Sequence, residues 1–214
     1  MKTYWVKTGS IIKRFFKGYV WDVPNSSNTI YLTFDDGPTP EITEWVLNTL
    51  KQHDIKATFF CIGNNIEKHP DIFKKVVEQG HSIANHTFNH VNGWNTQNDA
   101  YLENTDACEK SIERHTGTVC KQKLFRPPYG KIKSAQAAEV RKRGYKIIMW
   151  DVLSADFDKT ITPQKCLANV TKNTRQGSVI IFHDSVKAFP NLEYALPKAI
   201  NYLKGKGFNF AALD

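Results

Sequence analysis

Two adjacent carboxylates, Asp35 and Asp36, stand directly after an apolar run and directly before a Gly-Pro pair. The run at residues 30–34 (IYLTF) has the β-branched and aromatic bias of a buried strand, and Gly-Pro is strong turn punctuation. The two acids are therefore expected side by side at the C-terminal mouth of a strand. Because neighbouring carboxylates repel each other, a fold that holds them together usually supplies a cation or a separate task for each. An ordinary Asp-Gly turn is the alternative interpretation.

Two histidines with a metal-binding spacing follow at His86 and His90. On one helical turn, side chains at i and i+4 share a face and can present two imidazole nitrogens to one metal. Such a pair alone is more often an ordinary surface or core pair, and its combination with Asp35 and Asp36 is what favours a metal. Two histidines and one carboxylate make a three-ligand site with room for water, suited to zinc or a similar divalent ion.

Strand and helix signals alternate along the chain after an aromatic and basic lead-in at residues 1–28. The predicted strands are 29–34, 57–63, 81–85, 123–126, 146–152, 178–182 and 208–211. The predicted helices are 40–52, 66–79, 98–115, 134–143, 162–175 and 191–204. About seven β-α units, with strands too apolar to be buried on one face only, indicate a parallel sheet covered by helices, either open or closed into a barrel. Because linker composition and internal repeats are lacking, residues 1–214 are predicted to form one domain.

Candidate catalytic groups follow nearly every predicted strand. In a parallel α/β fold the residues just after each strand share one face, and that face carries the active site. The polar or ionisable groups expected there lie at 35–36, 86–90, 126–130, 151–156 and 183–184. Such a coincidence is much harder to obtain by chance than any single motif, so an active site is predicted at this face.

Four short segments also match, in order, the motifs of a known enzyme family. Residues 33–38 (TFDDGP), 86–90 (HTFNH) and 126–130 (RPPYG) resemble the first three motifs of the polysaccharide deacetylases, the NodB-homology group of carbohydrate esterase family 4. Residues 180–184 (IIFHD) resemble the last motif of that family. The resemblance implies a distorted, incomplete (β/α) barrel of about seven strands, in agreement with the units counted above.

The resemblance also implies a reaction. It indicates a metal-dependent hydrolase that removes N-acetyl groups, or alternatively O-acetyl groups, from a polysaccharide such as peptidoglycan or a chitin-like GlcNAc polymer. Asp36, His86 and His90 would hold a divalent metal, with Zn²⁺ expected and Co²⁺, Ni²⁺ or Mn²⁺ as alternatives. Asp35 would be the general base and His183 the general acid.

Further residues are expected to support these groups. By the same resemblance, Arg126 would steady Asp35 and keep it ionised, and the backbone N–H of Tyr129 would contribute to an oxyanion site. Substrate contacts are expected from a small set of side chains, with plain core packing as the alternative for each: Tyr129, Pro128, Trp150 and Ile181.

The fourth motif of the family, usually Asp-x-x-Asp-Trp, is altered in this chain. The matching residues 153–157 (LSADF) have Leu153 in place of the first acid and Phe157 in place of the Trp. Asp156 matches the second acid, which in the family orients and tunes the acid histidine, and Asp151 is the alternative for that role. The altered motif motivates a second hypothesis, a carbohydrate-binding protein that keeps the fold without turnover.

Composition is that of a globular protein with a basic balance. The 214 residues are 41% hydrophobic and 23% charged, and the formal net charge is +8. A basic balance favours polyanions, so a module that binds nucleic acid or anionic lipid is a third hypothesis. The metal motifs make this the minor one. The expected partner is an acetylated glycan, no nucleic acid is expected, and the protein is predicted to be a monomer.

Membrane and export signals are lacking in the sequence. No apolar run approaches the roughly 18 residues of a membrane span, and residues 1–7 lack the apolar region of a secretory signal. The cysteines are scattered without a CxxC pair, so free thiols in a reducing compartment are expected for Cys61, Cys108, Cys120 and Cys166. These features predict a cytoplasmic location. Association with the cell envelope is the alternative, because family members act mostly on cell walls or exported glycans.

Overall fold

The structure, a computed structural model, describes residues 4–117 and 122–214. The strands are β1 Thr29–Asp35, β2 Thr58–Cys61, β3 Ser82–Asn85, β4 Lys123–Phe125, β5 Tyr145–Ile147, β6 Val152–Leu153, β7 Val179–His183 and β8 Asn209–Ala211. The α-helices are α1 Ser10–Phe15, α2 Ile42–Gln52, α3 Gly63–Lys68, α4 Pro70–Glu78, α5 Asn98–Thr116, α6 Ser134–Lys142, α7 Pro163–Asn173 and α8 Phe189–Gly205. Two short 3-10 helices are η1 Gly93–Asn95 and η2 Pro128–Gly130.

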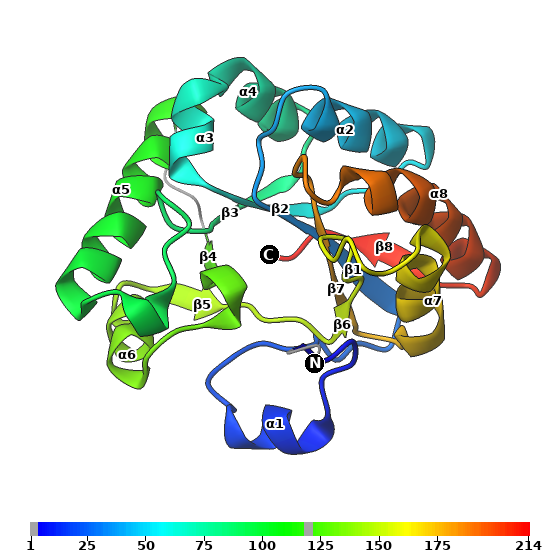
Figure 1. The fold of residues 1–214 in the computed structure, drawn as a ribbon, viewed down its shortest axis with the longest axis horizontal. Helices are drawn as coiled ribbons and strands as arrows, with labels where there is room; N and C mark the ends of the chain where they lie inside the picture. Colours follow the sequence, from blue (N-terminus) through cyan, green and yellow to red (C-terminus); the bar gives the residue numbers. More distant parts are fainter. Residues whose placement is uncertain (1–3, 118–121) are drawn as a thin grey trace.

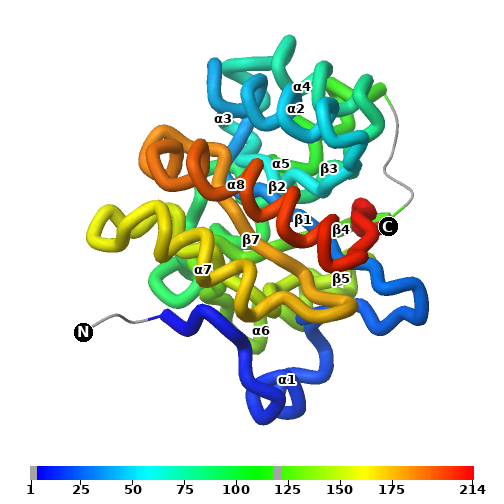
Figure 2. The backbone as a smooth tube through the Cα atoms, turned by 90° about the vertical axis from the view of Figure 1, so that its right-hand side faces the viewer, coloured from blue at the N-terminus to red at the C-terminus, as the bar shows by residue number. Residues whose placement is uncertain are grey.

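The strands form one parallel sheet that curls on itself. Its order is β5-β4-β3-β2-β1-β7-β6, and β8 pairs with the first half of β1. Helices α2 to α8 surround the strands on the outside (Figure 1), and α7 packs against α8 (Figure 2). Because β5 and β6 stand at the two ends of the path without pairing, the barrel is not closed. The predicted distorted, incomplete (β/α) barrel of about seven strands is confirmed.

The N-terminal segment lies where the barrel is open. Isolated bridges join Lys7 to Val152 and Val20 to Ile148, so the segment contacts the chain at β6 and just after β5. Lys7 also forms an ion pair with the buried carboxylate of Asp151, between those two strands. Figure 1 shows α1 and its flanking chain on the side that the other helices leave uncovered. The lead-in therefore completes the wall of the barrel.

Alternation along β1 decides what faces the helices and what faces the barrel interior. Ile30, Leu32 and Phe34 are buried in the main hydrophobic core with residues of α2 and α8. Burying each such side chain stabilises the fold by about 1.5–3 kcal/mol. Thr33 and Asp35 fall on the opposite face, since successive side chains of a strand alternate. This alternation places Asp35 inside the barrel at the carboxyl end of its central strand.

Three predicted elements differ from the structure. The helix predicted at 66–79 is two helices, α3 and α4, because Pro70 lacks an N–H donor and begins a new helix after His69. The helix predicted from residue 40 begins at Ile42, since Glu41 has a left-handed φ of 65°. The strand predicted at 146–152 is wrong as one element: β5 and β6 are separate because the chain between them crosses the open side of the barrel.

Other expectations concern cysteines and membranes. Three of the cysteines, Cys61, Cys108 and Cys166, are buried free thiols, as predicted, and Cys120 lies outside the described residues. Within 4–117 and 122–214, no helix combines the length and the apolar character that crossing a bilayer requires.

Candidate active site

Most of the predicted site residues converge at the carboxyl ends of the strands, around one cleft of about 610 Å³. The predicted residues that line it are Asp35, Asp36, His86, His90, Tyr129, Trp150, Ile181 and His183. Arg126 and Asp156 are fully buried behind its wall. Pro128 is buried at the start of η2 and its neighbour Pro127 lines the cleft, so the substrate contact expected of Pro128 stays a prediction.

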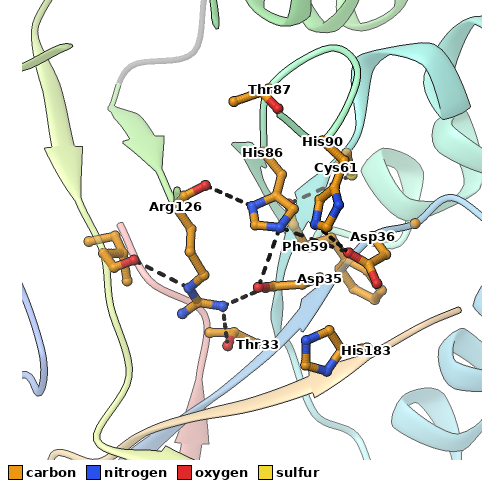
Figure 3. A network of polar contacts seen from close by, with 12 residues as sticks. Thr33, Asp35, Asp36, Phe59, Cys61, His86, Thr87, His90, Arg126 and His183 are labelled. Atoms are coloured by element: carbon orange, nitrogen blue, oxygen red, sulfur yellow. Dashed lines mark hydrogen bonds and ion pairs between the residues drawn. The ribbon is translucent and has the colours of Figure 1, made fainter. Parts of the chain in front are cut away.

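The sheet register brings the expected base and acid together. β1 and β7 are adjacent parallel strands, and Asp35 lies directly opposite His183 in their pairing. In Figure 3, His183 lies across the two aspartates from His86 and His90. The two central strands therefore set the spacing of these groups.

Arg126 forms a buried ion pair with Asp35. Its Nη1 donates to Asp35 Oδ1 at 2.6 Å and to Thr33 Oγ1 at 2.8 Å. Its Nε and Nη2 donate to the carbonyl oxygens of Ile148 and Met149, at 3.2 and 3.0 Å (Figure 3 shows the bonds to Asp35 and Thr33). Burial lowers the pKa of Arg126, and the charge of Asp35 opposes that shift. The hydrogen bond from Arg126 to Asp35 is therefore charge-assisted and fixes the position of that carboxylate.

Asp36, His86 and His90 form the predicted three-residue ligand group. One ligand atom from each lies within 4.8 Å of the others. Asp36 Oδ1 is 3.3 Å from His90 Nε2 and 3.9 Å from His86 Nε2, and this oxygen is buried without a hydrogen-bond partner. A buried carboxylate oxygen without a donor is costly, and a cation between the three atoms would satisfy it.

The two imidazoles are suited to metal binding. Burial lowers the pKa of His86, and nearby His90 lowers it further; burial also lowers the pKa of His90, although Asp36 opposes that shift. Metal ligation requires neutral imidazole, which these shifts favour. His86 Nδ1 is 2.7 Å from the carbonyl oxygen of Arg126, so Nε2 points toward Asp36. The donor set therefore fits a divalent metal.

The expectation that His86 and His90 share a helical turn is wrong, although both reach the same site. They lie in a loop after β3, in which Thr87 and His90 have left-handed φ values of 62° and 54°. The Thr87 N–H donates to Asn85 Oδ1 at 2.9 Å, and the Val91 N–H donates to Thr87 Oγ1 at 3.1 Å. Left-handed non-glycine residues cost about 1–3 kcal/mol each, so these contacts must hold the loop.

Asp156 holds the imidazole of His183. His183 Nδ1 lies 2.8 Å from Asp156 Oδ1, and the His183 N–H donates to Asp156 Oδ2 at 2.7 Å. Burial disfavours the imidazolium, yet the charge and hydrogen bond of Asp156 outweigh it, with further help from Asp36 and Asp35, and raise the pKa of His183 to about 9. Asp151 instead pairs with lysines of the lead-in. Of the two acids considered from the sequence, Asp156 is the one in contact with His183.

Asp184 is a buried residue of the site to which sequence reasoning gave no role. Its carboxylate accepts the Gly37 N–H at 3.0 Å and the Thr43 hydroxyl at 2.5 Å. A Cβ at Gly37 would lie 2.0 Å from Asp184 Oδ2, so only glycine fits there. Burial raises the pKa of Asp184 to about 8. Its position after His183 was visible in the sequence, but its contact with the turn that follows Asp36 depends on the pairing of β1 and β7.

The altered fourth motif gives the cleft an apolar side. Leu153 and Phe157 line it, and the Phe157 ring centre is 5.1 Å from that of His183. Tyr4 also lines the cleft, with its ring 5.5 Å from that of Phe157. No sequence signal pointed to Tyr4, because the lead-in reaches the site only through the open side of the barrel.

Comparisons with known proteins agree with this site. The sequence profile described as "Polysaccharide deacetylase" matches residues 22–148. A protein of Bacillus cereus named peptidoglycan-N-acetylglucosamine deacetylase is 37% identical over 196 residues, which cover 91% of this chain and 70% of that protein. A second protein of that name and organism is 34% identical over 92% of both chains. The peptidoglycan-N-acetylmuramic acid deacetylase PdaA of Bacillus subtilis is 30% identical over 96% of this chain and 76% of PdaA.

Solved structures give the same likeness. The crystal structure of the Bc1960 peptidoglycan N-acetylglucosamine deacetylase, in complex with 4-naphthalen-1-yl-N-oxidanyl-benzamide, matches with a TM-score of 0.86. The two chains are 35% identical, and the match covers 94% of each.

Proposed function

Because this chain belongs to the polysaccharide deacetylase family, we propose that its substrate is peptidoglycan and that it removes the N-acetyl groups of GlcNAc residues. As a member of that family it is a hydrolase that releases acetyl groups from a polysaccharide. The names of its relatives support peptidoglycan over a chitin-like polymer, and GlcNAc over N-acetylmuramic acid as the deacetylated sugar. The observation that carries the proposal is the ligand group of Asp36, His86 and His90 beside Asp35, which lies opposite His183 in the sheet.

We propose that the ligand group holds Zn²⁺. Two neutral imidazoles and one carboxylate are ligands that zinc commonly takes in hydrolases, and three protein ligands leave a position for water. When bound, such an ion lowers the pKa of water and polarises the acetyl carbonyl. Co²⁺, Ni²⁺ and Mn²⁺ accept similar ligands and remain alternatives.

Asp35 and His183 move the protons in the proposed reaction. Asp35, held in place by Arg126, takes a proton from the water whose oxygen attacks the acetyl carbon. The backbone N–H of Tyr129 stabilises the negative charge that develops on the acetyl oxygen. His183, protonated at neutral pH because its pKa is about 9, donates a proton to the sugar nitrogen as the C–N bond breaks. The products are acetate and a free amino sugar.

The apolar side of the cleft receives the acetyl methyl group in this proposal. Trp150, Leu153 and Ile181 line the cleft beside His183. Gly130 permits the close approach of Trp150, because a Cβ there would lie 2.6 Å from its ring. Leu153 stands where the family's fourth motif has its first acid. It makes this wall of the cleft more apolar, which suits a methyl group.

Acetate release tests the proposal. Wild type should release acetate from GlcNAc oligomers and from peptidoglycan, a chelator should abolish the release, and Zn²⁺ should restore it. Asp35→Asn should lower kcat by about 10²–10⁴-fold, the usual contribution of general base catalysis. The control is Asp106→Asn, which removes a surface ion pair with Arg143 and should leave kcat unchanged.

Two results would contradict the proposal. Release that is indifferent to both the chelator and Asp35→Asn would exclude this chemistry. Tight glycan binding without release by the Zn²⁺-loaded protein would favour the carbohydrate-binding hypothesis instead. The single domain, the monomeric state, the cytoplasmic location and the lack of a nucleic acid partner remain predictions of the sequence.

A further inference from the structure

An aromatic and basic platform extends the cleft beyond the ligand group. The ring of Tyr129, which is 60% exposed, lies 4.6 Å from that of His90. Two residues further on, Lys131 lines the same cleft, with its Nζ 5.1 Å from the ring centre of Trp94. The indole of Trp94 is 59% exposed. A continuous path therefore leads from the ligand group, over Tyr129 and Lys131, to an exposed indole.

This platform is fixed in place by its surroundings. The Gly93 N–H donates to the carbonyl oxygen of Lys131 at 3.2 Å, and a Cβ at Gly93 would lie 2.6 Å from that oxygen. Trp94 Nε1 donates to the carbonyl oxygen of Ile132 at 3.3 Å. Gln136 Nε2 donates to the carbonyl oxygen of Gly93 at 3.0 Å. These bonds hold η1 against the loop after η2, so the indole and the ammonium group are presented together.

Lys131, the cation of the platform, has no acidic partner in the part of the chain that the structure describes. Among residues 4–117 and 122–214, Lys131 forms no ion pair, whereas Lys7 and Lys123 are paired with acids. The acidic residues of the described chain that line the cleft are Asp35 and Asp36, which belong to the reacting centre. A negative charge for Lys131 would therefore have to come from the ligand.

We propose that Trp94 and Lys131 form a subsite for a carboxylate-bearing sugar, adjacent to the sugar that loses its acetyl group. The inference rests on the proposed function and deepens it. The flat, exposed indole offers an apolar surface for the face of a sugar ring, and the ammonium group beside it can donate charge-assisted hydrogen bonds to a carboxylate. In peptidoglycan that carboxylate is the lactyl group of the neighbouring sugar or belongs to the peptide attached to it. A neutral GlcNAc polymer offers no such group.

Binding and turnover of three glycans test the subsite. The probes are GlcNAc oligomers, peptide-free strands of alternating GlcNAc and N-acetylmuramic acid, and the same strands with peptides. Kd is measured in an Asp35→Asn background, which prevents turnover in the proposed reaction, and kcat/KM is measured with Asp35 intact. The variants are Lys131→Gln and Trp94→Ala. The matched control is Lys198→Gln, which removes a lysine 4.2 Å from the Tyr194 ring on α8, away from the cleft.

Lys131→Gln should weaken binding of carboxylate-bearing strands by about tenfold, the worth of one charge-assisted hydrogen bond, and leave the neutral oligomers unchanged. Trp94→Ala should weaken binding of all three glycans, and Lys198→Gln should weaken none. A loss confined to strands with peptides assigns the peptide carboxylate. A loss confined to peptide-free strands assigns the lactyl carboxylate, because the attached peptide converts that carboxyl into an amide. A loss on both kinds of strand means that Lys131 binds whichever carboxylate the strand offers.

The subsite is refuted if Lys131→Gln weakens all three glycans equally or weakens none. It is also refuted if amidation of the carboxylates leaves the effect of Lys131→Gln unchanged. Failure of wild type to release acetate from any of the three glycans would count against the proposed function alone, because the Kd comparison does not depend on turnover.

Discussion

Two ion pairs lie beside the ligand group and place their charges in opposite ways. In the pair of Asp35 and Arg126, the carboxylate faces the cleft and the cation is buried behind it. In the pair of His183 and Asp156, the imidazole faces the cleft and the carboxylate is buried behind it. In each pair a buried side chain of opposite charge supports the residue that reaches the substrate.

The pairs differ in the side chain that carries the positive charge, which is Arg126 in one and His183 in the other. Arg126 remains charged in proteins at any ordinary pH, and its guanidinium meets four acceptors, so the cation beside Asp35 is fixed. His183 has a pKa of about 9 and therefore titrates within the range in which enzymes are assayed. The comparison teaches that the cation beside the base is fixed and that the acid is the pH-sensitive partner, so activity should fall at alkaline pH.

The largest effect is expected when the ion pair of Asp35 and Arg126 is broken. Arg126→Gln leaves the carboxylate of Asp35 buried without its cation, which should lower the free energy of unfolding by about 3–5 kcal/mol and kcat by about 10²–10⁴-fold. Denaturant unfolding and acetate release measure these changes. Arg126→Lys keeps the charge and should retain more stability, and Arg143→Gln, which removes a surface pair with Asp106, is the control. Wild-type kcat in Arg126→Gln would show that Asp35 does not depend on this partner.

An intermediate effect is expected when the ion pair of His183 and Asp156 is broken. In Asp156→Asn the imidazole keeps the burial that disfavours its charge but loses its main counter-charge, so its pKa should fall from about 9 toward or below the ordinary value of about 6.5. The alkaline limb of the kcat profile should move to lower pH by more than one unit, and kcat at pH 8 should fall by about 10²-fold. The control is Asp158→Asn in the same loop, in which the alkaline limb of the kcat profile should stay near pH 9. If the alkaline limb of Asp156→Asn does not move, His183 is not the general acid.

The same pair predicts how stability depends on pH. The folded pKa of His183 is raised above its unfolded value, so its contribution is fully present below about pH 6.5 and is lost as the pH rises through about 9. The free energy of unfolding of wild type should therefore decline between pH 7 and 10 more steeply than that of Asp156→Asn. Urea unfolding at several pH values measures both slopes, and parallel slopes would contradict the assignment.

The smallest effect is expected when Thr33, which accepts a hydrogen bond from Arg126, is replaced. Thr33→Val removes the hydroxyl that accepts from Arg126 and donates to the carbonyl oxygen of Ile180. Leaving these buried groups without a partner should cost about 1–3 kcal/mol of unfolding free energy, with less than a tenfold change in kcat. Thr58→Val, which removes an acceptor for the Leu213 N–H, should cost similar stability and leave kcat unchanged. A loss of kcat in Thr33→Val as large as that in Arg126→Gln would mean that Thr33 itself touches the substrate.

The general position of the site could be predicted because it follows from strand ends alone. Parallel strands share one carboxyl edge, so Asp35, His86, Arg126 and His183, each at or just after a strand, had to meet there. The assignment of about seven strands needed only the apolar runs and their turn residues. Local sequence is enough for both inferences, since neither depends on how a particular loop is shaped.

Loop shapes could not be predicted, because tertiary contacts decide them. The spacing of His86 and His90 fits a helical turn, yet bonds to Asn85 and Thr87 select a left-handed loop instead. Trp94 was not singled out from the sequence, because its place beside Lys131 depends on the packing of η1 against the loop after η2. The break between β5 and β6 is another such case, since the open side of the barrel is a property of the whole sheet.

The pairing of β1 with β7 also limits when the protein can become active during its synthesis. Thr33 and its hydrogen-bond partner on β7, Ile180, are 147 residues apart in the chain. At about 5–20 residues per second, β1 leaves the ribosome roughly 7–30 s before that partner exists. Its buried face, Ile30, Leu32 and Phe34, stays uncovered for that time and is a natural target for chaperones. A nascent chain that carries Asp35 but not yet His183 holds only half of the proton-transfer pair, so no glycan can be processed before β7 has been made.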